Sequence, residues 1–167
     1  GLARPALISG RQERGRRGGT ENLPGIAGFA AACDAAAATQ QDDIVRMAAF
    51  RVSLEDGLRT ALPDMVLVSA DAPRLPNTVC VRFAELDADV VLTRLEKAGV
   101  LASSGAACSA GGTQPSHVLM AMGFTPKQAR AGVRFSLGRG TTQAEIDFAI
   151  AALRQAADDT LAWVRGG

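Results

Sequence analysis

Residues 75–101 read LPNTVCVRFAELDADVVLTRLEKAGVL, and the change of pattern within them decides the fold. Over residues 78–83 apolar and polar side chains alternate strictly, which is typical of a strand with one buried face. Asp87 is a good N-cap for a helix that ends before Gly99. Residues 100–101 suggest a further short strand. A strand, a helix and a second strand in sequence predict a layer of helices packed on a sheet.

The pattern continues toward the C-terminus. Pro115 is expected to open one short helix and Thr125 to cap another. Residues 132–137 alternate again, so we expect a second half-buried strand there. Thr142 and Glu145 have the spacing of a capping box for a last, long helix.

The N-terminal side has a different character. Residues 1–21 are rich in glycine and arginine, which argues against any regular element. Two helices are predicted next, over residues 24–39 and 41–62. The predicted fold class is therefore α+β, a small antiparallel or mixed sheet covered by helices and preceded by two long helices. Residues 1–40 are expected to be the end of a larger domain, and residues 41–167 a small α/β domain.

Composition excludes several classes of protein. Of the 167 residues 47% are apolar and 21% are charged, and the net charge is +1. No apolar run approaches the ~18 residues of a membrane span. Nothing therefore points to a membrane or nucleic-acid partner. Three widely spaced cysteines and one histidine argue against a zinc site and a disulfide framework. We expect free thiols, no metal, and a reducing compartment, the cytoplasm.

The cysteine with the most informative surroundings is Cys108. It lies in residues 103–112, SSGAACSAGG, where no large side chain can bury a thiol or hold the loop still. An accessible thiol is half of what a reactive cysteine needs, and a lowered pKa is the other half. From this stretch alone, an inert surface cysteine fits equally well. Cys33 and Cys80 lie in predicted regular elements and are expected to be packing residues.

Two further residues could bind anions. Arg134 lies on the second face of its strand, where a guanidinium can clamp a carboxylate, although its position alone favours a plain surface residue. Thr20 ends a glycine-rich segment, residues 10–20, whose backbone N–H groups could bind an anion. A solvated loop or a nucleic-acid arm fits the same segment, but the arm would lack aromatic residues for stacking.

Four stretches together carry a resemblance to a known family. They are GRQERGRRGGTENLPGI (10–26), LPNTVCVRF (75–83), SSGAACSAGGTQPSHVLMAMG (103–123) and VRFSLGRGTTQAEID (133–147). In this order and spacing they resemble the C-terminal part of a cysteine desulfurase. These enzymes use pyridoxal 5′-phosphate (PLP) and belong to the class V aminotransferases, and the likeness is to the branch for iron–sulfur assembly and nitrogen fixation. The resemblance implies the C-terminal domain of a fold-type I PLP-dependent transferase.

The resemblance also implies roles for three residues. Cys108 matches the nucleophile that takes sulfur from L-cysteine as a persulfide and leaves L-alanine. Arg134 matches the arginine that holds the substrate carboxylate. Thr20 matches the threonine that reaches the cofactor phosphate of the other subunit in a homodimer. A sulfur-acceptor protein, such as an iron–sulfur scaffold, is the implied partner.

One departure from the family pattern is large. The lysine that binds PLP lies, in the family, in a Ser-x-His-Lys stretch upstream of the glycine-rich loop, and neither Lys97 nor Lys127 has that setting. The chain is therefore expected to be a C-terminal piece that is inactive alone. Ala106, where the family often has serine, is a minor departure. The alternatives are another class V enzyme, such as a selenocysteine lyase, and a non-catalytic binding module.

Overall fold

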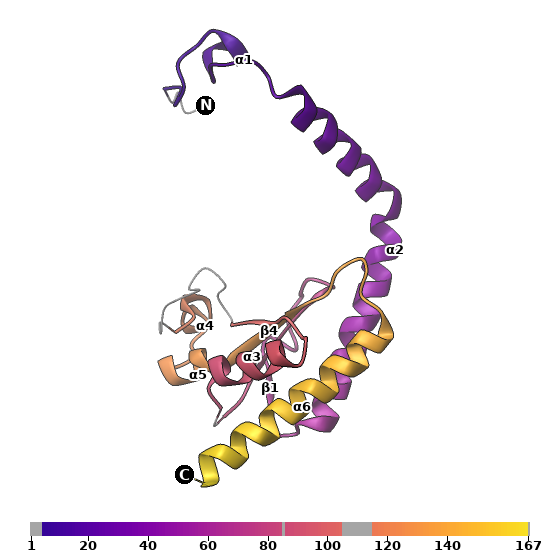
Figure 1. The fold of residues 1–167 in the computed structure, drawn as a ribbon, viewed down its shortest axis with the longest axis vertical. Helices are drawn as coiled ribbons and strands as arrows, with labels where there is room; N and C mark the ends of the chain where they lie inside the picture. The colour runs from indigo at the N-terminus through magenta and orange to yellow at the C-terminus, as the bar shows by residue number, and fades with distance from the viewer. Residues whose placement is uncertain (1–4, 85, 105–114, 167) are drawn as a thin grey trace. The chain divides into compact units, whose positions relative to one another are not determined.

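The computed structural model describes residues 5–84, 86–104 and 115–166 of the chain. Contacts between Cα atoms divide the chain into two compact units, residues 1–40 and 41–167. The assignment of the first unit to a larger cofactor domain stays a prediction. The helices and strands of both units are labelled in Figure 1.

The first unit contains a short helical turn and the start of a long helix. The turn, α1 (Gln12–Gly15), has left-handed backbone at Glu13 and Arg14, with φ of 51° and 58°. It is thus not a regular helix, as the abundance of glycine in this segment predicts. Asn22 caps the helix that follows, since its side-chain oxygen accepts a hydrogen bond from the Gly25 N–H at 3.1 Å.

The prediction of two successive N-terminal helices is wrong. A single helix of 39 residues, α2 (Leu23–Ala61), runs through the expected break. No proline or glycine stands near residue 40, and the Thr39 hydroxyl donates to the Ala35 carbonyl one turn earlier, at 3.4 Å. Among the described residues no helix is both long enough and apolar enough to cross a membrane.

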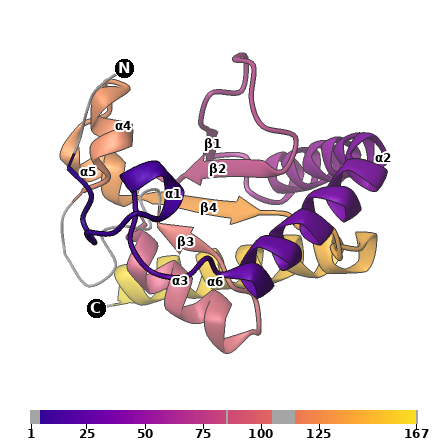
Figure 2. The same ribbon diagram turned by 90° about the horizontal axis from the view of Figure 1, so that it is seen from above.

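The second unit is built on four short strands, β1 (Val66–Leu67), β2 (Thr78–Arg82), β3 (Ser103–Ser104) and β4 (Gly132–Ser136). Their order in the sheet is β1-β2-β4-β3, and every neighbouring pair is antiparallel (Figure 2). The brief strand predicted at residues 100–101 is wrong, because β3 begins later. The Val100 N–H is already used, since it donates to the Leu95 carbonyl at the end of the preceding helix.

Four helices accompany the sheet: α3 (Ala88–Lys97), α4 (His117–Ala121), α5 (Pro126–Arg130) and α6 (Gln143–Gly166). The predicted starts of α3, α5 and α6 are confirmed, whereas α4 begins two residues after the predicted Pro115 and is capped by Ser116. Asp87 accepts from the Asp89 N–H at 2.8 Å, and Thr125 forms a capping box with Gln128. Glu145 accepts from the Thr142 N–H at 2.8 Å. Gly99 follows α3 with a φ of +87°, a left-handed conformation that favours glycine there.

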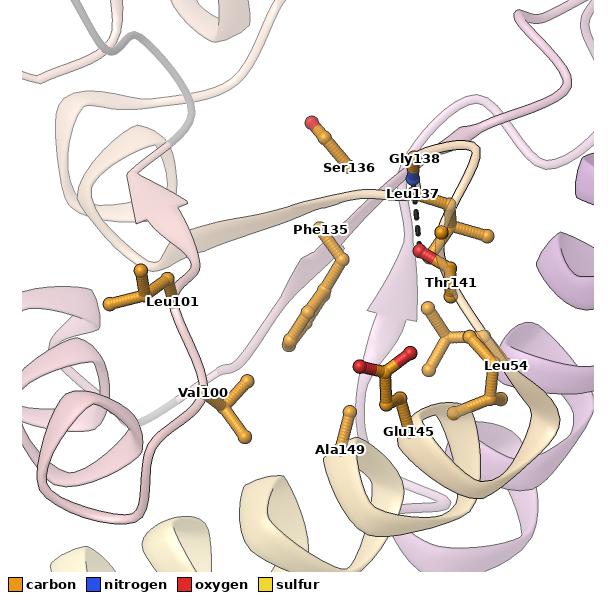
Figure 3. A pocket seen from close by; sticks show the side chains of 12 residues that line it. Leu54, Val100, Leu101, Phe135, Ser136, Leu137, Gly138, Thr141, Glu145 and Ala149 are labelled. Atoms are coloured by element: carbon orange, nitrogen blue, oxygen red, sulfur yellow. Dashed lines mark hydrogen bonds between the residues drawn. The ribbon is translucent and has the colours of Figure 1, made fainter.

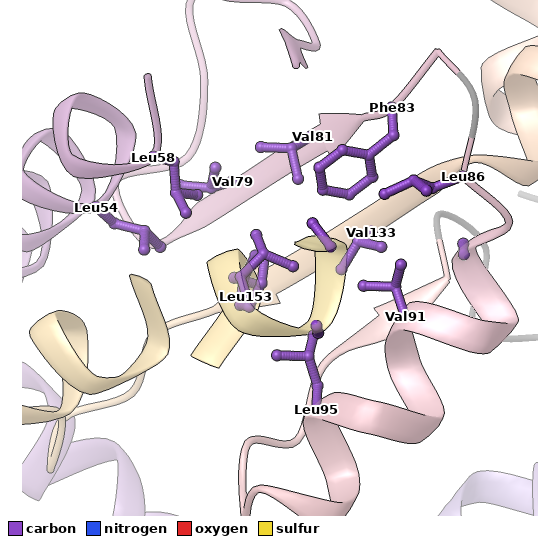
Figure 4. Packing of buried hydrophobic residues seen from close by; sticks show 14 of the residues in the cluster. Leu54, Leu58, Val79, Val81, Phe83, Leu86, Val91, Leu95, Val133 and Leu153 are labelled. Atoms are coloured by element: carbon purple, nitrogen blue, oxygen red, sulfur yellow. The ribbon is translucent and has the colours of Figure 1, made fainter. Parts of the chain in front are cut away.

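The hydrophobic core lies between one face of the sheet and the helices α2, α3 and α6 (Figure 4). The side chains of Val79, Val81 and Val133 are fully buried there, which confirms the predicted inward faces of β2 and β4. Helices α2 and α6 come close at Gly57, where a Cβ atom would collide with the Ile150 side chain. The alternation in the strands therefore leaves the opposite face of the sheet outside this core.

A smaller apolar cluster covers part of the second face. It is formed by Val68, Leu119 and Ala129, with Cys80 and Phe124 packed against it. Helix α4 packs closely on β4 at Gly132, where an added Cβ atom would lie 2.8 Å from Leu119 Cδ1 and would force that side chain to shift. Helices α4 and α5 thus cover one end of this face.

The core assignment predicts a large stability difference between two leucines. Leu153→Ala, at a fully buried position, should lower the free energy of unfolding by about 2–5 kcal/mol, because it removes packed methyl groups and leaves a cavity. Leu101 is the matched control position, since its side chain is 84% exposed. Leu101→Ala should change stability by less than about 0.5 kcal/mol. Urea unfolding of the two variants measures both effects, and equal losses would place Leu153 outside the core.

Candidate functional site

The site is built around Arg134, at the middle of β4. Its side chain lies on the face of the sheet opposite the core, and it is half-buried. Cross-strand pairing sets Cys80 of β2 directly beside it on one side and Ser103 of β3 on the other. Among the described residues, no carboxylate forms an ion pair with Arg134. It is a cation held in place without an anionic partner in that part of the chain.

Arg134 lines a cavity of about 360 Å³, which we call the Arg134 cavity. The strands β2 and β4 form its floor, α4 forms one wall, and the connection between β1 and β2 forms the other. The described residues that line it are Val68, Ser69, Arg74, Leu75, Thr78, Cys80, Val118, Leu119, Met122 and Arg134. This set holds two guanidinium groups and no carboxylate, among mostly apolar walls. Such a cavity suits a small carboxylate with a compact remainder.

Cys80 is part of the wall of this cavity rather than a reactive group. Burial raises the pKa of its thiol, and the positive charge of Arg134 opposes that rise. The thiol is therefore protonated at neutral pH, which makes it a poor nucleophile. The expectation that Cys80 is a packing residue is confirmed. The same expectation for Cys33 is wrong, because Cys33 is exposed on α2, in a run of small side chains.

A buried ion cluster beside the cavity escaped the sequence analysis. Glu55 of α2 is only 5% exposed and accepts hydrogen bonds from two arginines. Arg51 Nη1 lies 2.8 Å from Glu55 Oε1, and Arg74 Nη1 lies at the same distance from that oxygen. The i,i+4 spacing of Arg51 and Glu55 was a visible signal in the sequence. Nothing local could have indicated Arg74, which comes from the β1–β2 connection.

A second cavity, of about 440 Å³, lies on the core side of the sheet near the turn from β4 to α6 (Figure 3). Glu145 supplies its carboxylate. That group is already committed, because it accepts from the backbone N–H and the hydroxyl of Thr142 at 2.8 and 3.0 Å. The turn itself is closed by the Gly138 N–H, which donates to the Thr141 hydroxyl at 3.0 Å. These contacts stabilise the start of α6.

The three predicted site residues do not share one described unit. Thr20 belongs to the first unit, where it is exposed and its carbonyl accepts from Arg17 Nη1 at 3.0 Å. Arg134 belongs to the second unit. Cys108 lies outside the described residues. Among the residues that the structure describes, no group of acidic, histidine or cysteine side chains could hold a metal ion.

The fit to PLP is partial. Thr20 offers a hydroxyl for a phosphate group, and Arg134 offers a contact for a substrate carboxylate. The lysines Lys97, at the end of α3, and Lys127, in α5, are both exposed on helix surfaces, and neither lines the Arg134 cavity. The chain therefore supplies no lysine in a setting that would bind the aldehyde of the cofactor.

Comparison with known proteins gives a consistent result. The family model described as Aminotransferase class-V matches residues 8–148. The chain is 43% identical over 147 residues to a cysteine desulfurase of Enterobacter agglomerans, with 88% of this chain and 36% of that protein covered. To a cysteine desulfurase of Rhodobacter capsulatus it is 43% identical over 150 residues, covering 90% and 39%. The chain thus spans less than half the length of these curated relatives.

Solved structures agree with this. A NifS-like protein from Rickettsia africae superimposes with a TM-score of 0.81 at 30% identity, and the match covers 93% of this chain and 40% of that one. A second NifS-like protein gives a TM-score of 0.79 at 29% identity, with 95% and 40% covered. The α+β fold with a small antiparallel sheet, predicted from the sequence, is confirmed.

The geometry of Cys80 predicts its reactivity. At pH 8 its alkylation by iodoacetamide should be several-fold slower in the folded chain than in urea, because burial raises its pKa and restricts access. Replacement of the neighbouring charge by Arg134→Gln should raise that pKa further and shift the pH profile of alkylation upward. Mass spectrometry of the modified peptides measures both effects. The exposed Cys33 is the internal reference, and its rate should be the same in both proteins. A downward shift would contradict the assigned role of Arg134.

Proposed function

Because this chain belongs to the class V aminotransferase family, we propose that it is part of a PLP-dependent cysteine desulfurase, an enzyme that takes sulfur from L-cysteine and leaves L-alanine. The observation that carries this proposal is Arg134, a guanidinium without an ionic partner among the described residues, on the floor of a mostly apolar cavity. The curated relatives are cysteine desulfurases, which supports it.

Arg134 has the properties needed to hold the carboxylate of an amino acid. Its planar fork can donate two parallel hydrogen bonds, and its strand holds it between β2 and β3. The remainder of the cavity accepts a small uncharged side chain such as the CH₂–SH of cysteine. Arg74, the other guanidinium in the cavity wall, is already paired with Glu55. Arg134 is therefore the cation that we expect the substrate carboxylate to reach.

Cys108 is proposed to be the nucleophile. Its thiolate attacks the sulfur of the bound cysteine, so an S–S bond forms and the C–S bond of the substrate breaks. The electron pair of that bond stays with the carbon, which takes up a proton and becomes the methyl group of alanine. The products are L-alanine and a persulfide on Cys108, and the atoms balance without an oxidant. The surrounding small residues, 103–112, would let the persulfide reach an acceptor.

PLP, when bound, would supply the electron sink that makes this cleavage possible. In this chain Thr20 is proposed to contact its phosphate, across the interface of a homodimer. The first unit also exposes large apolar side chains along α2, since Leu23, Ile26 and Phe29 are 69%, 56% and 73% exposed. Apolar side chains exposed in this way usually mark a surface that another part of the protein or a partner covers. This supports the proposal that residues 1–40 are the end of a cofactor-binding domain.

We further propose that the sulfur acceptor is an iron–sulfur scaffold protein and that the enzyme works in the cytoplasm. The likeness of the loop around Cys108 to the branch of the family for iron–sulfur assembly supports both statements. An accessible persulfide would be short-lived in an oxidising compartment, and a protein acceptor would receive it by attack of its own thiolate.

The Arg134 assignment predicts a loss of catalytic efficiency. In the full-length enzyme that the proposal implies, Arg134→Ala should lower kcat/KM for L-cysteine by roughly 10- to 150-fold, the equivalent of the ~1.5–3 kcal/mol of a charged hydrogen bond. Arg134→Lys should lower kcat/KM by less, because lysine keeps the positive charge and loses only the second parallel hydrogen bond. Arg130→Ala, which removes an exposed arginine of α5, is the control and should behave as the parent enzyme. Steady-state sulfide assays compare these variants with the parent enzyme, and an unchanged kcat/KM for Arg134→Ala would contradict the proposal.

The Cys108 assignment predicts a separation of binding from sulfur release. Cys108→Ala should still bind L-cysteine, because Arg134 remains, but should produce no sulfide in the presence of a thiol reductant. Cys33→Ala is the matched control, as a cysteine outside the proposed mechanism, and should keep parent activity. Cys108 should also be alkylated first of the three thiols in the folded protein. Sulfide production by Cys108→Ala at the parent rate would show that another group is the nucleophile.

The partial fit to PLP predicts that the 167-residue chain alone is inactive. Supplied with PLP and L-cysteine, it should release no sulfide above the rate of free PLP, because neither Lys97 nor Lys127 has the setting of a cofactor lysine. Sulfide release and absorbance in the visible aldehyde–amine band of the cofactor measure this. Lysine-dependent absorbance together with turnover would contradict it.

A further inference from the structure

We propose that Glu55 is a positioning residue for the Arg134 cavity. Through Arg74 it holds the connection between β1 and β2, residues 68–77, in place as one wall of the cavity. The inference rests on the proposed function in one respect only, that the cavity receives the carboxylate of L-cysteine. Neither Glu55 nor Arg74 is expected to touch the reacting atoms.

The contact between helix and wall is strong and directional. Arg74 Nη1 lies 2.8 Å from Glu55 Oε1 and Nη2 lies 3.3 Å from Oε2, so the two planar groups meet fork to fork. The side chain of Glu55 is 6% exposed and that of Arg74 is 15% exposed, which limits screening by solvent. Arg51 adds a second donor to Glu55 at 2.8 Å. The carboxylate is thus held on α2 even without Arg74.

The middle of this wall is held by the contact of Arg74 with Glu55, whereas its two ends are held by the sheet. Its ends are tied to the sheet, because the Val68 N–H donates to the Cys80 carbonyl and the Asn77 side chain donates to the Leu137 carbonyl. Between them, within the described part of the chain, residues 69–76 make no hydrogen bond or ion pair to another element besides those of Arg74 with Glu55. Arg74 Nη2 also donates to the Ala70 carbonyl at 3.2 Å, so it braces the connection internally.

Charge gives Glu55 a second effect on the cavity. Arg74 and Arg134 both line it, and an unpaired Arg74 would compete with Arg134 for the substrate carboxylate. The buried carboxylate of Glu55 occupies the Arg74 fork and leaves Arg134 as the available one. The binding of the substrate carboxylate should therefore depend on a residue that it does not contact.

Two variants of the cofactor-loaded, full-length enzyme separate position from charge. Glu55→Gln removes a negative charge, and Arg74→Met removes a positive charge while it keeps the apolar stem. Their effects on the local electrostatic potential are opposite. Arg74→Met removes the contact between α2 and the wall, and Glu55→Gln weakens it, because the amide keeps one acceptor oxygen but loses the charge and the second acceptor. Asp56→Asn is the matched control, because Asp56 neighbours Glu55 but makes an exposed ion pair with Arg59. If Glu55→Gln fails to fold, Arg74→Met carries the test alone, since Glu55 keeps Arg51.

The first measurement does not depend on activity. It is the rate at which iodoacetamide alkylates Cys80, which lines the same cavity. Both Glu55→Gln and Arg74→Met should raise that rate several-fold, and Asp56→Asn should leave it unchanged. Opposite changes in the two variants would show that charge, and not the position of the wall, controls Cys80. That result, or no change in either variant, overturns the inference.

The second measurement is the split between KM and kcat for L-cysteine. Both tether variants, Glu55→Gln and Arg74→Met, should raise KM by about tenfold with kcat within about twofold, because positioning of the carboxylate is lost and the reacting groups remain. An unchanged KM, while Arg134→Ala lowers kcat/KM, overturns the inference and leaves the proposed function standing. If Arg134→Ala itself has no effect, the proposed function fails, and the Cys80 rates still decide whether Glu55 holds the wall.

Discussion

The antiparallel pairing of β2 with β4 is the constraint on which the rest of the molecule depends. Its register sets Val81 opposite Val133 on the core face and Cys80 opposite Arg134 on the other face. A slip of one residue would turn every side chain of a strand to the opposite face, so it would bury Arg134 in the core. The packing energy of the core therefore also holds the guanidinium of the proposed site in place.

The arginines on and around the second face of the sheet differ in how their charge is satisfied. Arg74 meets a buried carboxylate. Arg82 lies over the ring of Phe124, with 5.5 Å between its guanidinium carbon and the ring centre. Arg134 has only the neutral Cys80 and Ser103 as cross-strand neighbours among the described residues. A partly buried arginine in a folded protein is normally paired with an anion or a ring. Arg134 has no such partner among the described residues, so an external anion would bind best there.

The two units divide the proposed chemistry. The second unit provides the carboxylate contact and, with Cys108, the sulfur-accepting group; the first unit provides Thr20. The lysine of the cofactor belongs, by family resemblance, to a segment upstream of the glycine-rich loop. The chain covers 36% of the length of one curated relative and carries Thr20, Cys108 and Arg134, the three residues to which we propose roles in sulfur transfer.

Local chemistry in the sequence was enough to determine the elements of the second unit. Strict alternation located β2 and β4 and their buried faces, and the caps at Asp87, Thr125 and Thr142 located three helices, because these patterns depend on neighbours a few residues apart. The same reasoning was wrong at residue 40, where propensity alone does not break a helix, and at residues 100–101, where the backbone is used by the end of α3.

Only the tertiary structure decided the surroundings of the site. The cavity needs α4, two strands and the β1–β2 connection to meet, and the contact of Arg74 with Glu55 joins residues 19 positions apart. Likewise, the burial that raises the pKa of Cys80 arises from segments distant in the chain. Contacts between residues distant in the sequence cannot be read from local patterns, because they are selected by the free energy of the whole packed core.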